Sequence, residues 1–496
     1  MPSSHRPNVL LIHTDQHRWD CLGVTGNPDV RTPHVDALAA DGATYTDSFC
    51  CFPICTPSRY SLLNGLYVHQ HLGWTNKSTP PQGLETFPQI LREAGYDTAA
   101  VGKMHFTPTY LDQGFDRMAL CEQDGEGRWD DDYHRYLAER GLVDRLDLMD
   151  QRAEYRTEAP DAYFACFGAR ESDLPEEHHG TTWIGDRACE EIARWSPGSP
   201  SLLMAGFVKP HHPFDPPAPW SGMYDPAALT ILPGWTERMP PEDAALGKGY
   251  FDNTTLTEAA LREVMAMYYA TISQIDHHVG RMIALLADKG LYDDTLIVFT
   301  SDHGEYLGFH HRLLKGNHMY DPMVKVPLII KPPGQRGAGT VSDALVSNVD
   351  VAATILAAAG CRRGEHMRGL DLAARPGGRD VVFAEDGLRT MVRTRTHKLL
   401  CDRDGARSQL LDLRADPLEM ENLLAQGEHR AVAEDLRERL LRWALFDAPT
   451  PTHRWDNAPR IDQPNVPAPD DAHRKRMIEY YRRKMAGAGE TVFGTE

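Results

Sequence analysis

The chain lacks the features that mark membrane and secreted proteins. No apolar run approaches the roughly 18 residues of a membrane span, and residues 1–7 lack the apolar core and cleavage site of a signal peptide. The nine cysteines, which include the adjacent pair Cys50 and Cys51, have irregular spacing unlike a disulfide framework. These absences predict a cytoplasmic protein with reduced thiols and no membrane partner.

Positive charge is also scarce. With 52 Lys and Arg against 71 Asp and Glu, the formal net charge is -19, which argues against nucleic acid and anionic membranes as partners. This field would repel an anionic substrate, so a site for one needs a local excess of positive charge. A metal ion and a few Arg, Lys and His side chains would supply it, because charges act most strongly at short range.

Common nucleotide-binding and hydrolase signatures are missing too. We find no dinucleotide fingerprint, phosphate-binding loop or Gly-x-Ser-x-Gly nucleophile elbow. What the chain does contain is an alternation of strand-like apolar runs and helical patterns. This alternation predicts an α/β fold with a large, mostly parallel sheet flanked by helices. The expected strands are residues 8–14, 97–101, 201–208, 296–300 and 326–330, and the expected helices are 86–94 and 257–289.

Three regions are distinguished by composition. Residues 1–375 are predicted to form the catalytic domain, in which the acidic, aromatic and irregular stretch 123–190 reads as an insertion over the sheet edge or the site. A linker-like cluster at 375–379 precedes a predicted α+β subdomain, 376–446. Its expected elements are antiparallel strands at 381–385, 390–395, 397–402 and 409–413 and a helix at 431–445.

The tail, 447–496, is Pro-rich and charged, with one helical stretch at 471–485. It is predicted to be either an arm on a neighbouring subunit of a homo-oligomer or a loosely held end.

Polar and charged residues come soon after four of the expected strands. They are Asp15, Gln16, Lys103, His105, His211, Asp302 and His303. In open α/β sheets, ligands bind at the carboxyl ends of the strands. We therefore expect these four segments, far apart in sequence, to meet at one active site.

Four of these residues are candidate metal ligands. Asp15, Gln16 and Asp302 offer oxygen atoms, which suit calcium, magnesium or manganese, and the His303 imidazole favours manganese or another transition metal. Alternatively, Asp15 could cap a helix and Asp302 could lie in a turn. Their shared position at two strand ends favours a site for one divalent metal.

The most informative stretch is Cys55-Thr56-Pro57-Ser58-Arg59. This pattern is read by the enzyme that oxidises cysteine to Cα-formylglycine, so a formylglycine-generating enzyme is an expected partner. The aldehyde hydrates to a geminal diol, of which one hydroxyl can attack sulfur or phosphorus and the other can later expel the product. Pro57 predicts a helix that begins near it, with Cys55 just ahead of the free amides. The alternative is a buried free cysteine at a helix start.

The run from Cys55 to Gly65 resembles the active-site signature of the type I, formylglycine-dependent sulfatases of the alkaline phosphatase superfamily. Residues 95–105 resemble the second signature of that family, which ends in Gly-Lys-x-His, and residues 210–214 resemble its Pro-His segment. The resemblance extends over residues 8–425.

This resemblance implies a role for each site residue. Arg59 would hold the diol or an anionic oxygen, Lys103 would neutralise a non-bridging oxygen, and His105 would act as general base. His211 would protonate the leaving oxygen, with Lys315 beside it. The implied catalytic set is Cys55, Arg59, Lys103, His105, His211 and Lys315, the metal ligands are Asp15, Gln16, Cys55, Asp302 and His303, and Asn76 contacts the substrate.

Two positions depart from the best-known arylsulfatases, which have two adjacent Asp at 15–16 and Asp-Asn at 302–303. Asp15-Gln16, Asp302-His303 and Asn76 are similar to bacterial choline sulfatases and phosphonate monoester hydrolases. The predicted function is hydrolysis of small-molecule sulfate monoesters by an arylsulfatase-like enzyme with calcium or manganese. The alternatives are a phosphonate monoester hydrolase or phosphodiesterase that uses the same site, and a catalytically dead binding protein of the same fold.

Overall fold

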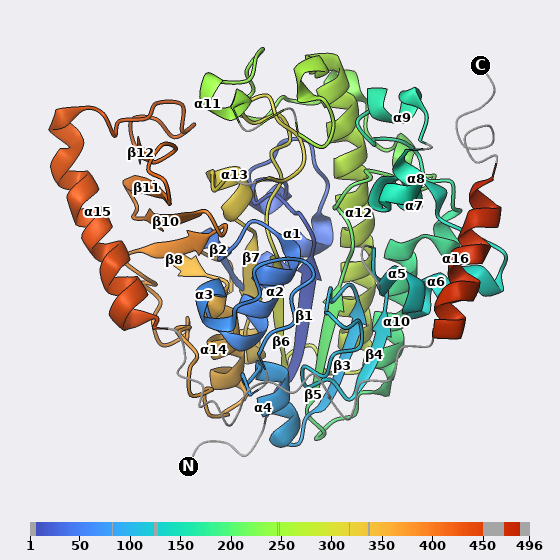
Figure 1. The fold of residues 1–496 in the computed structure, drawn as a ribbon. Coiled ribbons are helices and arrows are strands. Elements are labelled where there is room, and N and C mark those ends of the chain that lie inside the picture. The colour runs from blue at the N-terminus through green and yellow to red at the C-terminus, as the bar shows by residue number, and fades with distance from the viewer. Residues whose placement is uncertain are drawn as a thin grey trace.

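The computed structural model describes residues 6–449 and 471–486, except 82, 124–126, 158, 246, 248, 317 and 336–337. An eight-stranded sheet with the order β4-β3-β5-β1-β6-β7-β2-β8 forms the centre of the molecule, with helices on both of its faces (Figure 1). A second sheet, β12-β11-β10-β9, lies to one side. The predicted fold class is confirmed.

The strands of the large sheet are β1 (Asn8–Thr14), β2 (Ala43–Phe49), β3 (Asp97–Gly102), β4 (Arg117–Leu120), β5 (Ser201–Gly206), β6 (Thr295–Ser301), β7 (Leu328–Lys331) and β8 (Thr340–Ser347). All neighbours pair in parallel except β7, which is antiparallel to both β6 and β2. The five expected strands are present with ends shifted by a few residues. The sequence did not reveal β2, β4 and β8, because β2 and β8 are partly exposed and polar and β4 is short.

The longer helices are α1 (Pro33–Ala40), α2 (Cys55–Asn64), α4 (Phe87–Glu93), α10 (Gly180–Arg194), α12 (Glu258–Asp288) and α14 (Val349–Ala358), and short ones are α3 (Val68–His71), α11 (Pro241–Ala244) and α13 (Asp321–Val324). Both expected helices are confirmed as α4 and α12. Thr86 and Thr257 cap them, because each side chain accepts a hydrogen bond from an amide of the first turn.

The stretch 123–190 was predicted to be irregular, but much of it is helical. It contains the helices α5 (Gly127–Asp130), α6 (Asp132–Glu139), α7 (Arg145–Gln151), α8 (Ala153–Arg156) and α9 (Asp161–Ala165) and the start of α10. Part of the acidic composition that suggested a loop serves as caps: the Asp131 and Asp144 side chains accept hydrogen bonds from the first-turn amides of α6 and α7.

The second sheet contains β9 (Val382–Glu385), β10 (Arg389–Arg393), β11 (His397–Asp402) and β12 (Gln409–Asp412), all antiparallel as expected. Helix α15 (Arg430–Arg442) packs on it and ends three residues before the predicted end, followed by a π-helical turn, Trp443–Asp447. The Trp443 ring stacks on Phe383 at 4.5 Å and meets Tyr67 edge-on at 4.9 Å. The second sheet thus shares a core with the large domain.

The tail enters the structure only in part. Helix α16 (Asp471–Met485) matches its predicted range, and its Tyr481 ring packs on Trp129 at 5.2 Å. Residues 450–470 and 487–496 lie outside the described residues, so the predicted arm stays a prediction, as do the domain boundaries. All nine cysteines are free. Within the described ranges, no helix has both the length and the apolar character to cross a bilayer.

Buried histidines make the stability of this fold sensitive to acid. Burial lowers the pKa of both His71 and His179 to about 3, whereas in an unfolded chain the pKa of histidine is about 6.5. As the pH falls below about 6.5, the unfolded chain takes up protons first. The stability that these neutral rings contribute is therefore present above that pH and is lost progressively toward pH 3.

We expect the free energy of unfolding, measured by urea titration, to fall from pH 7 to pH 5. Each such histidine contributes a slope of up to about 1.4 kcal/mol per pH unit. In His179→Asn, the asparagine side chain still offers an acceptor for the Thr181 amide at the N-cap of α10, but it does not titrate. The free energy of unfolding of this variant should therefore depend less steeply on pH, by up to about 1.4 kcal/mol per pH unit. A wild-type slope in His179→Asn would contradict this account.

Candidate active site

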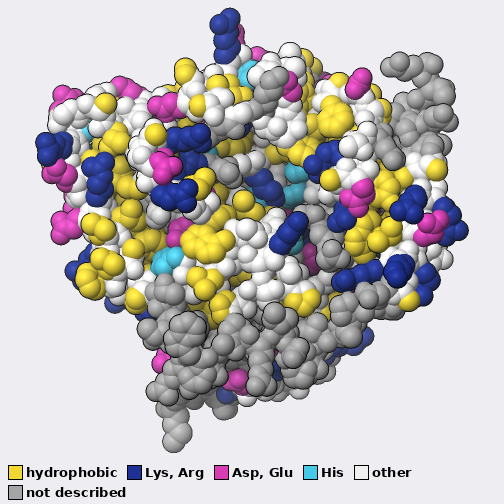
Figure 2. All heavy atoms as spheres, viewed as in Figure 1, with side chains coloured by type: hydrophobic (Ala, Val, Ile, Leu, Met, Phe, Trp, Pro, Cys, Tyr) yellow, Lys and Arg dark blue, Asp and Glu magenta, His cyan; other side chains and the backbone are white. Residues whose placement is uncertain are grey.

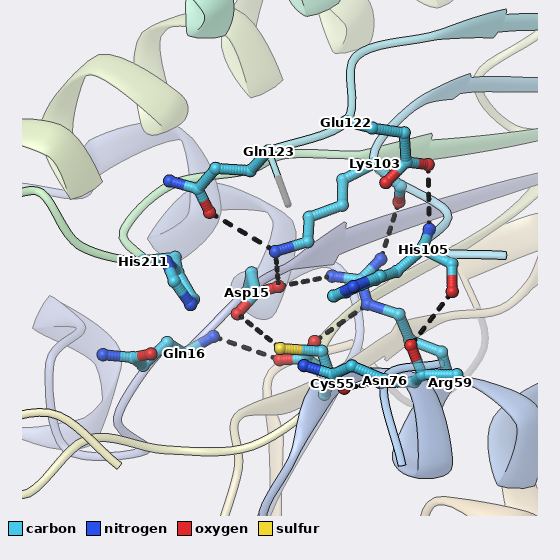
Figure 3. A network of polar contacts seen from close by, with 12 residues as sticks. Asp15, Gln16, Cys55, Arg59, Asn76, Lys103, His105, Glu122, Gln123 and His211 are labelled. Atoms are coloured by element: carbon cyan, nitrogen blue, oxygen red, sulfur yellow. Dashed lines mark hydrogen bonds and ion pairs between the residues drawn. The ribbon is translucent and has the colours of Figure 1, made fainter. Parts of the chain in front are cut away.

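The residues that follow four strands meet at one edge of the sheet. Strands β3, β5, β1 and β6 are consecutive neighbours, so their carboxyl ends lie side by side. Figure 3 shows Cys55 in one group with Lys103, which directly follows β3, His211, which lies beyond β5, and Asp15 and Gln16, which follow β1. Asp302 and His303 after β6 complete the group through contacts with Arg59 and Cys55. The expected convergence of the four segments is therefore observed.

Cys55 lies in the first turn of α2, not ahead of it as predicted. The helix begins two residues before Pro57, which is tolerated because the first amides of a helix need no internal acceptor. All ten residues of α2 are buried. The Cys55 Sγ atom lies 2.9 Å from Lys315 Nζ, 3.4 Å from His303 Nε2 and 3.6 Å from Asp15 Oδ1. The cysteine of the motif thus lies at the centre of the candidate residues.

Arg59 joins the two buried carboxylates. Its Nε donates to Asp302 Oδ2 at 2.9 Å, its Nη2 to Asp15 Oδ2 at 3.1 Å, and its Nη1 to the Lys103 carbonyl at 2.6 Å. Lys103 Nζ forms a second ion pair with Asp15 Oδ2 at 2.8 Å. The guanidinium expected to hold the diol or substrate therefore fixes the carboxylates and the Lys103 backbone, one helical turn beyond Cys55.

The remaining carboxylate oxygens face a common centre. One ligand atom from each of Asp15, Cys55, Asp302 and His303 lies within 4.8 Å of all the others, and all four residues are buried. His303 Nδ1 donates to the Gly304 carbonyl at 3.0 Å, which leaves Nε2 free to ligate. Two carboxylate oxygens, an imidazole nitrogen and position 55 fit a hard or borderline divalent cation.

Gln16 adds an amide oxygen to this donor set. Its Oε1 is buried and has no hydrogen-bond partner among the described residues, and its Nε2 donates to the buried Glu305 carboxylate. An unpaired buried acceptor is costly unless a cation or water satisfies it. Gln16 also has a φ of 64°, a left-handed conformation that is uncommon outside glycine. These features fit the predicted ligand role, and Glu305 is a supporting residue that the sequence did not reveal.

His211 and Lys315 form a close pair. Lys315 Nζ lies 2.7 Å from His211 Nε2, and His211 Nδ1 donates to the His212 carbonyl at 2.7 Å. Burial and then Lys315 lower the pKa of His211 well below its usual value. The ring is therefore neutral, with the lone pair of Nε2 directed at the lysine ammonium.

Lys103 and His105 belong to a turn that a buried carboxylate holds. Glu122 Oε1 accepts a hydrogen bond from the Met104 amide at 2.9 Å. It also accepts one from the His105 amide at 2.9 Å (Figure 3). The His105 φ of 58° is left-handed. Gly206 allows the turn to approach β5, because a Cβ at this position would lie 2.3 Å from the Lys103 carbonyl oxygen. Glu122 was missed in the sequence, although it follows β4 as the other site residues follow their strands.

Asn76 fastens a loop to the start of α2. The Asn76 Oδ1 atom accepts a hydrogen bond from the Thr56 amide at 3.1 Å, and Thr56 Oγ1 donates to the His105 carbonyl at 3.0 Å. Asn76 therefore lies beside the start of α2, and its oxygen is engaged with the backbone in this structure. Any contact with substrate would have to come from its amide nitrogen.

The site is locally cationic in an acidic protein. Burial raises the pKa of Asp15, but Lys103, Lys315 and Arg59 outweigh burial and hold it well below its usual range. Burial and Asp15 raise the pKa of the Cys55 thiol, but Lys315 and Lys103 hold it well below its ordinary value. Figure 2 shows a recess near the middle of this face in which Lys or Arg and His side chains gather. Several positive side chains are thus concentrated at the site of a chain whose formal net charge is -19.

The mostly parallel eight-stranded sheet, with the candidate metal ligands at one edge, is that of an alkaline phosphatase-like α/β protein. The sequence pattern of the family described as Sulfatase matches residues 7–361. The chain therefore belongs to the sulfatase family. The predicted family and its class, sulfuric ester hydrolase, are confirmed.

Two kinds of relative are similar to this chain over most of its length. An arylsulfatase of Clostridium perfringens is 29% identical over 476 residues, which cover 88% of this chain and 94% of the relative. The multifunctional alkaline phosphatase superfamily protein PehA of Trinickia caryophylli is 29% identical over 528 residues and covers 92% and 98%. The phosphonate monoester hydrolase structure of Agrobacterium radiobacter has a TM-score of 0.74 at 26% identity and covers 88% and 95%.

Removing the Glu122 carboxylate should impair the turn that carries Lys103 and His105. In Glu122→Ala, two buried amides lose their acceptor, and we expect kcat to fall at least about tenfold with a smaller change in KM, because positioning is lost. Glu122→Gln keeps Oε1 as an acceptor and should restore most of kcat. Steady-state kinetics of both variants check this, with circular dichroism to confirm folding. Equal activity of the Ala and Gln variants would contradict a positioning role.

Proposed function

We propose that this protein hydrolyses sulfate monoesters at a formylglycine formed from Cys55, with one divalent cation, calcium or manganese, held by Asp15, Gln16, Asp302, His303 and position 55. The observation that carries the proposal is the placement of Cys55: its Sγ, in the first turn of α2, lies 2.9 Å from Lys315 Nζ and within the candidate ligand group. Hydrated formylglycine supplies a nucleophilic hydroxyl and a second hydroxyl that allows sulfate to be released. A cation held by these residues would polarise an oxygen of the sulfate group and favour the ionised hydroxyl.

The protein's own cations bind the sulfate group. Lys315 Nζ contacts the reactive position, and Lys103 Nζ pairs with Oδ2 of Asp15, whose other oxygen lies 3.6 Å from Cys55 Sγ. The amides at the start of α2 add further donors for an anion. These groups are fixed before the substrate arrives, so they can stabilise charge on the transferring group with little rearrangement.

Proton transfer to the leaving alcohol is assigned to the Lys315–His211 pair. The lysine ammonium and the neutral imidazole lie 2.7 Å apart, so one proton is shared between them near the reacting atom. Delivery of that proton to the leaving oxygen avoids the release of an alkoxide. His105, whose Nδ1 is buried and has no hydrogen-bond partner in the part of the chain that the structure describes, is proposed to act as the base that assists release of sulfate.

Hydrolysis of phosphonate monoesters or phosphodiesters at the same site is the second candidate function. The similarity to the phosphonate monoester hydrolase of Agrobacterium radiobacter and to PehA supports it. The two activities differ in whether the central atom carries a second organic substituent. The substrates proposed here are small-molecule esters, and the proposed partner for maturation is a formylglycine-generating enzyme.

The deciding measurement is kcat/KM for 4-nitrophenyl sulfate and for 4-nitrophenyl phenylphosphonate, side by side. The enzyme is co-produced with a formylglycine-generating enzyme and supplied with calcium or manganese. We expect the sulfate to be preferred at least about tenfold, a difference of about 1.4 kcal/mol in transition-state binding. A preference for the phosphonate would replace the main proposal by the second candidate.

Cys55→Ala is the matched control for both substrates. It removes the only atom from which the nucleophile can form, so turnover should fall to background while the melting temperature changes little. Retained activity would exclude the proposed nucleophile. Substitution of the buried Cys50 by Ala tests whether any effect is specific to position 55, and Cys50→Ala should remain active.

The metal site is tested without reference to activity. Added Mn²⁺ or Ca²⁺ should stabilise the metal-depleted protein, by about 2.7 kcal/mol when its concentration is 100 times the dissociation constant. Asp302→Asn should lose most of this stabilisation in thermal unfolding, because a charged ligand is removed. Asp186→Asn, on the surface and paired with Arg281, is the control. If neither ion stabilises the wild type, the proposed site is wrong.

A further inference from the structure

His212 lies beside the proposed proton donor and has no role in the mechanism above. Its ring stacks on that of His211, with centroids 4.3 Å apart and an angle of 21° between the planes. The side chain is 9% exposed. A nearly buried histidine against the leaving-group side of the site needs either a structural or a substrate-binding explanation.

The backbone of His212 is fixed by three donors. Its carbonyl accepts hydrogen bonds from His211 Nδ1 at 2.7 Å, Gln123 Nε2 at 2.8 Å and Gln151 Nε2 at 3.0 Å. Gln123 Oε1 also accepts a hydrogen bond from Lys103 Nζ at 3.4 Å (Figure 3). His212 therefore has a fixed position relative to both Lys103 and His211.

The ring of His212 is oriented by a buried carboxylate. His212 Nδ1 lies 2.5 Å from Asp150 Oδ2, and Asp150 is fully buried. The Tyr163 and Tyr250 hydroxyls also donate to this carboxylate. Burial raises the pKa of Asp150, but His212 and Tyr163 outweigh burial and lower it. A buried carboxylate requires donors that satisfy it, and His212 Nδ1 and the two tyrosine hydroxyls supply them.

This arrangement leaves one ring nitrogen for other contacts. Nδ1 is engaged by Asp150, and among the described residues Nε2 has no hydrogen-bond partner. The Tyr250 ring lies 5.3 Å from the His212 ring, and the Arg156 guanidinium lies 4.4 Å from the centroid of Tyr250. An oriented ring nitrogen, an aromatic ring and the Arg156 guanidinium are thus placed next to His211, the residue proposed to serve the leaving oxygen.

We propose that His212, oriented by Asp150 and flanked by Tyr250 and Arg156, binds the alcohol part of the substrate, and that this alcohol carries an anionic group near the ester. The inference rests on the proposed function and adds a substrate class to it. A site built to hydrogen-bond a substrate group discriminates against analogues without that group, because its polar atoms are then left unpaired. The ester that this site favours is therefore doubly anionic.

The test compares 2-carboxy-4-nitrophenyl sulfate with 4-nitrophenyl sulfate on the matured, metal-supplied enzyme. We expect the ratio of their kcat/KM values to fall at least about tenfold in His212→Phe relative to wild type. His212→Gln keeps a neutral donor and should give an intermediate ratio. Taking ratios between enzymes cancels the different intrinsic reactivity of the two esters. The exposed His277→Gln on α12 is the control and should keep the wild-type ratio.

Calorimetric binding of the two product alcohols separates this inference from the proposed function. We expect the wild type to bind 5-nitrosalicylate at least about tenfold more tightly than 4-nitrophenol, and both His212 variants to lose part of this preference. This difference in binding affinity is expected whether or not sulfur is the atom that reacts. Equal ratios in wild type and variants, an equal fall for both esters, or equal binding of the two alcohols would each overturn the inference. Asp150→Asn, which keeps the shape of the side chain, should reproduce the loss if His212→Phe does not fold.

Discussion

The site depends on the burial of two carboxylates next to one another. Asp15 and Asp302 are at most 1% exposed, and such charges are costly inside a protein unless they are paired and hydrogen-bonded. Arg59 bridges both, and Lys103 pairs with Asp15. One oxygen of each carboxylate is thereby neutralised by the protein, and the other is left to face Cys55 and His303. Each of the two carboxylates can therefore serve both as a structural anchor and as a candidate metal ligand.

That requirement explains several features around the site. Helix α2 must be buried over its whole length to bring Arg59 between the carboxylates, so Cys55 in its first turn is buried as well. The glycine at position 206 allows the Lys103 turn to approach β5 closely enough for Lys103 to reach Asp15. Glu122 then holds the amides of that turn. The outer residues therefore position the inner ones, as expected of a site whose groups are fixed before substrate binds.

The insertion between β4 and β5 contributes the second ring of contacts. It supplies Gln123, which links Lys103 to the His212 carbonyl, and Asp150, which orients the His212 ring. This region was predicted only as an insertion over the sheet edge or the site. Its helices could not be predicted because they are short and capped by acidic side chains, and a run of capping residues has the same composition as a solvated loop. The proposed alcohol-binding residue, His212 after β5, therefore depends on this insertion for its orientation.

Local sequence determined the strands that are apolar on both faces, the capped helices, and the polar residues that follow β1, β3, β5 and β6. These features depend on neighbours within a few residues, so a single sequence reveals them. The cysteine motif and its family resemblance followed from the same kind of local information. Only the tertiary structure decided that β7 is antiparallel, that Arg59 bridges two carboxylates, and that Glu122 and Asp150 support the site. Each of these is a contact between segments far apart in the chain, and the identity of the partner is set by how the sheet and its insertion pack, not by the spacing of residues.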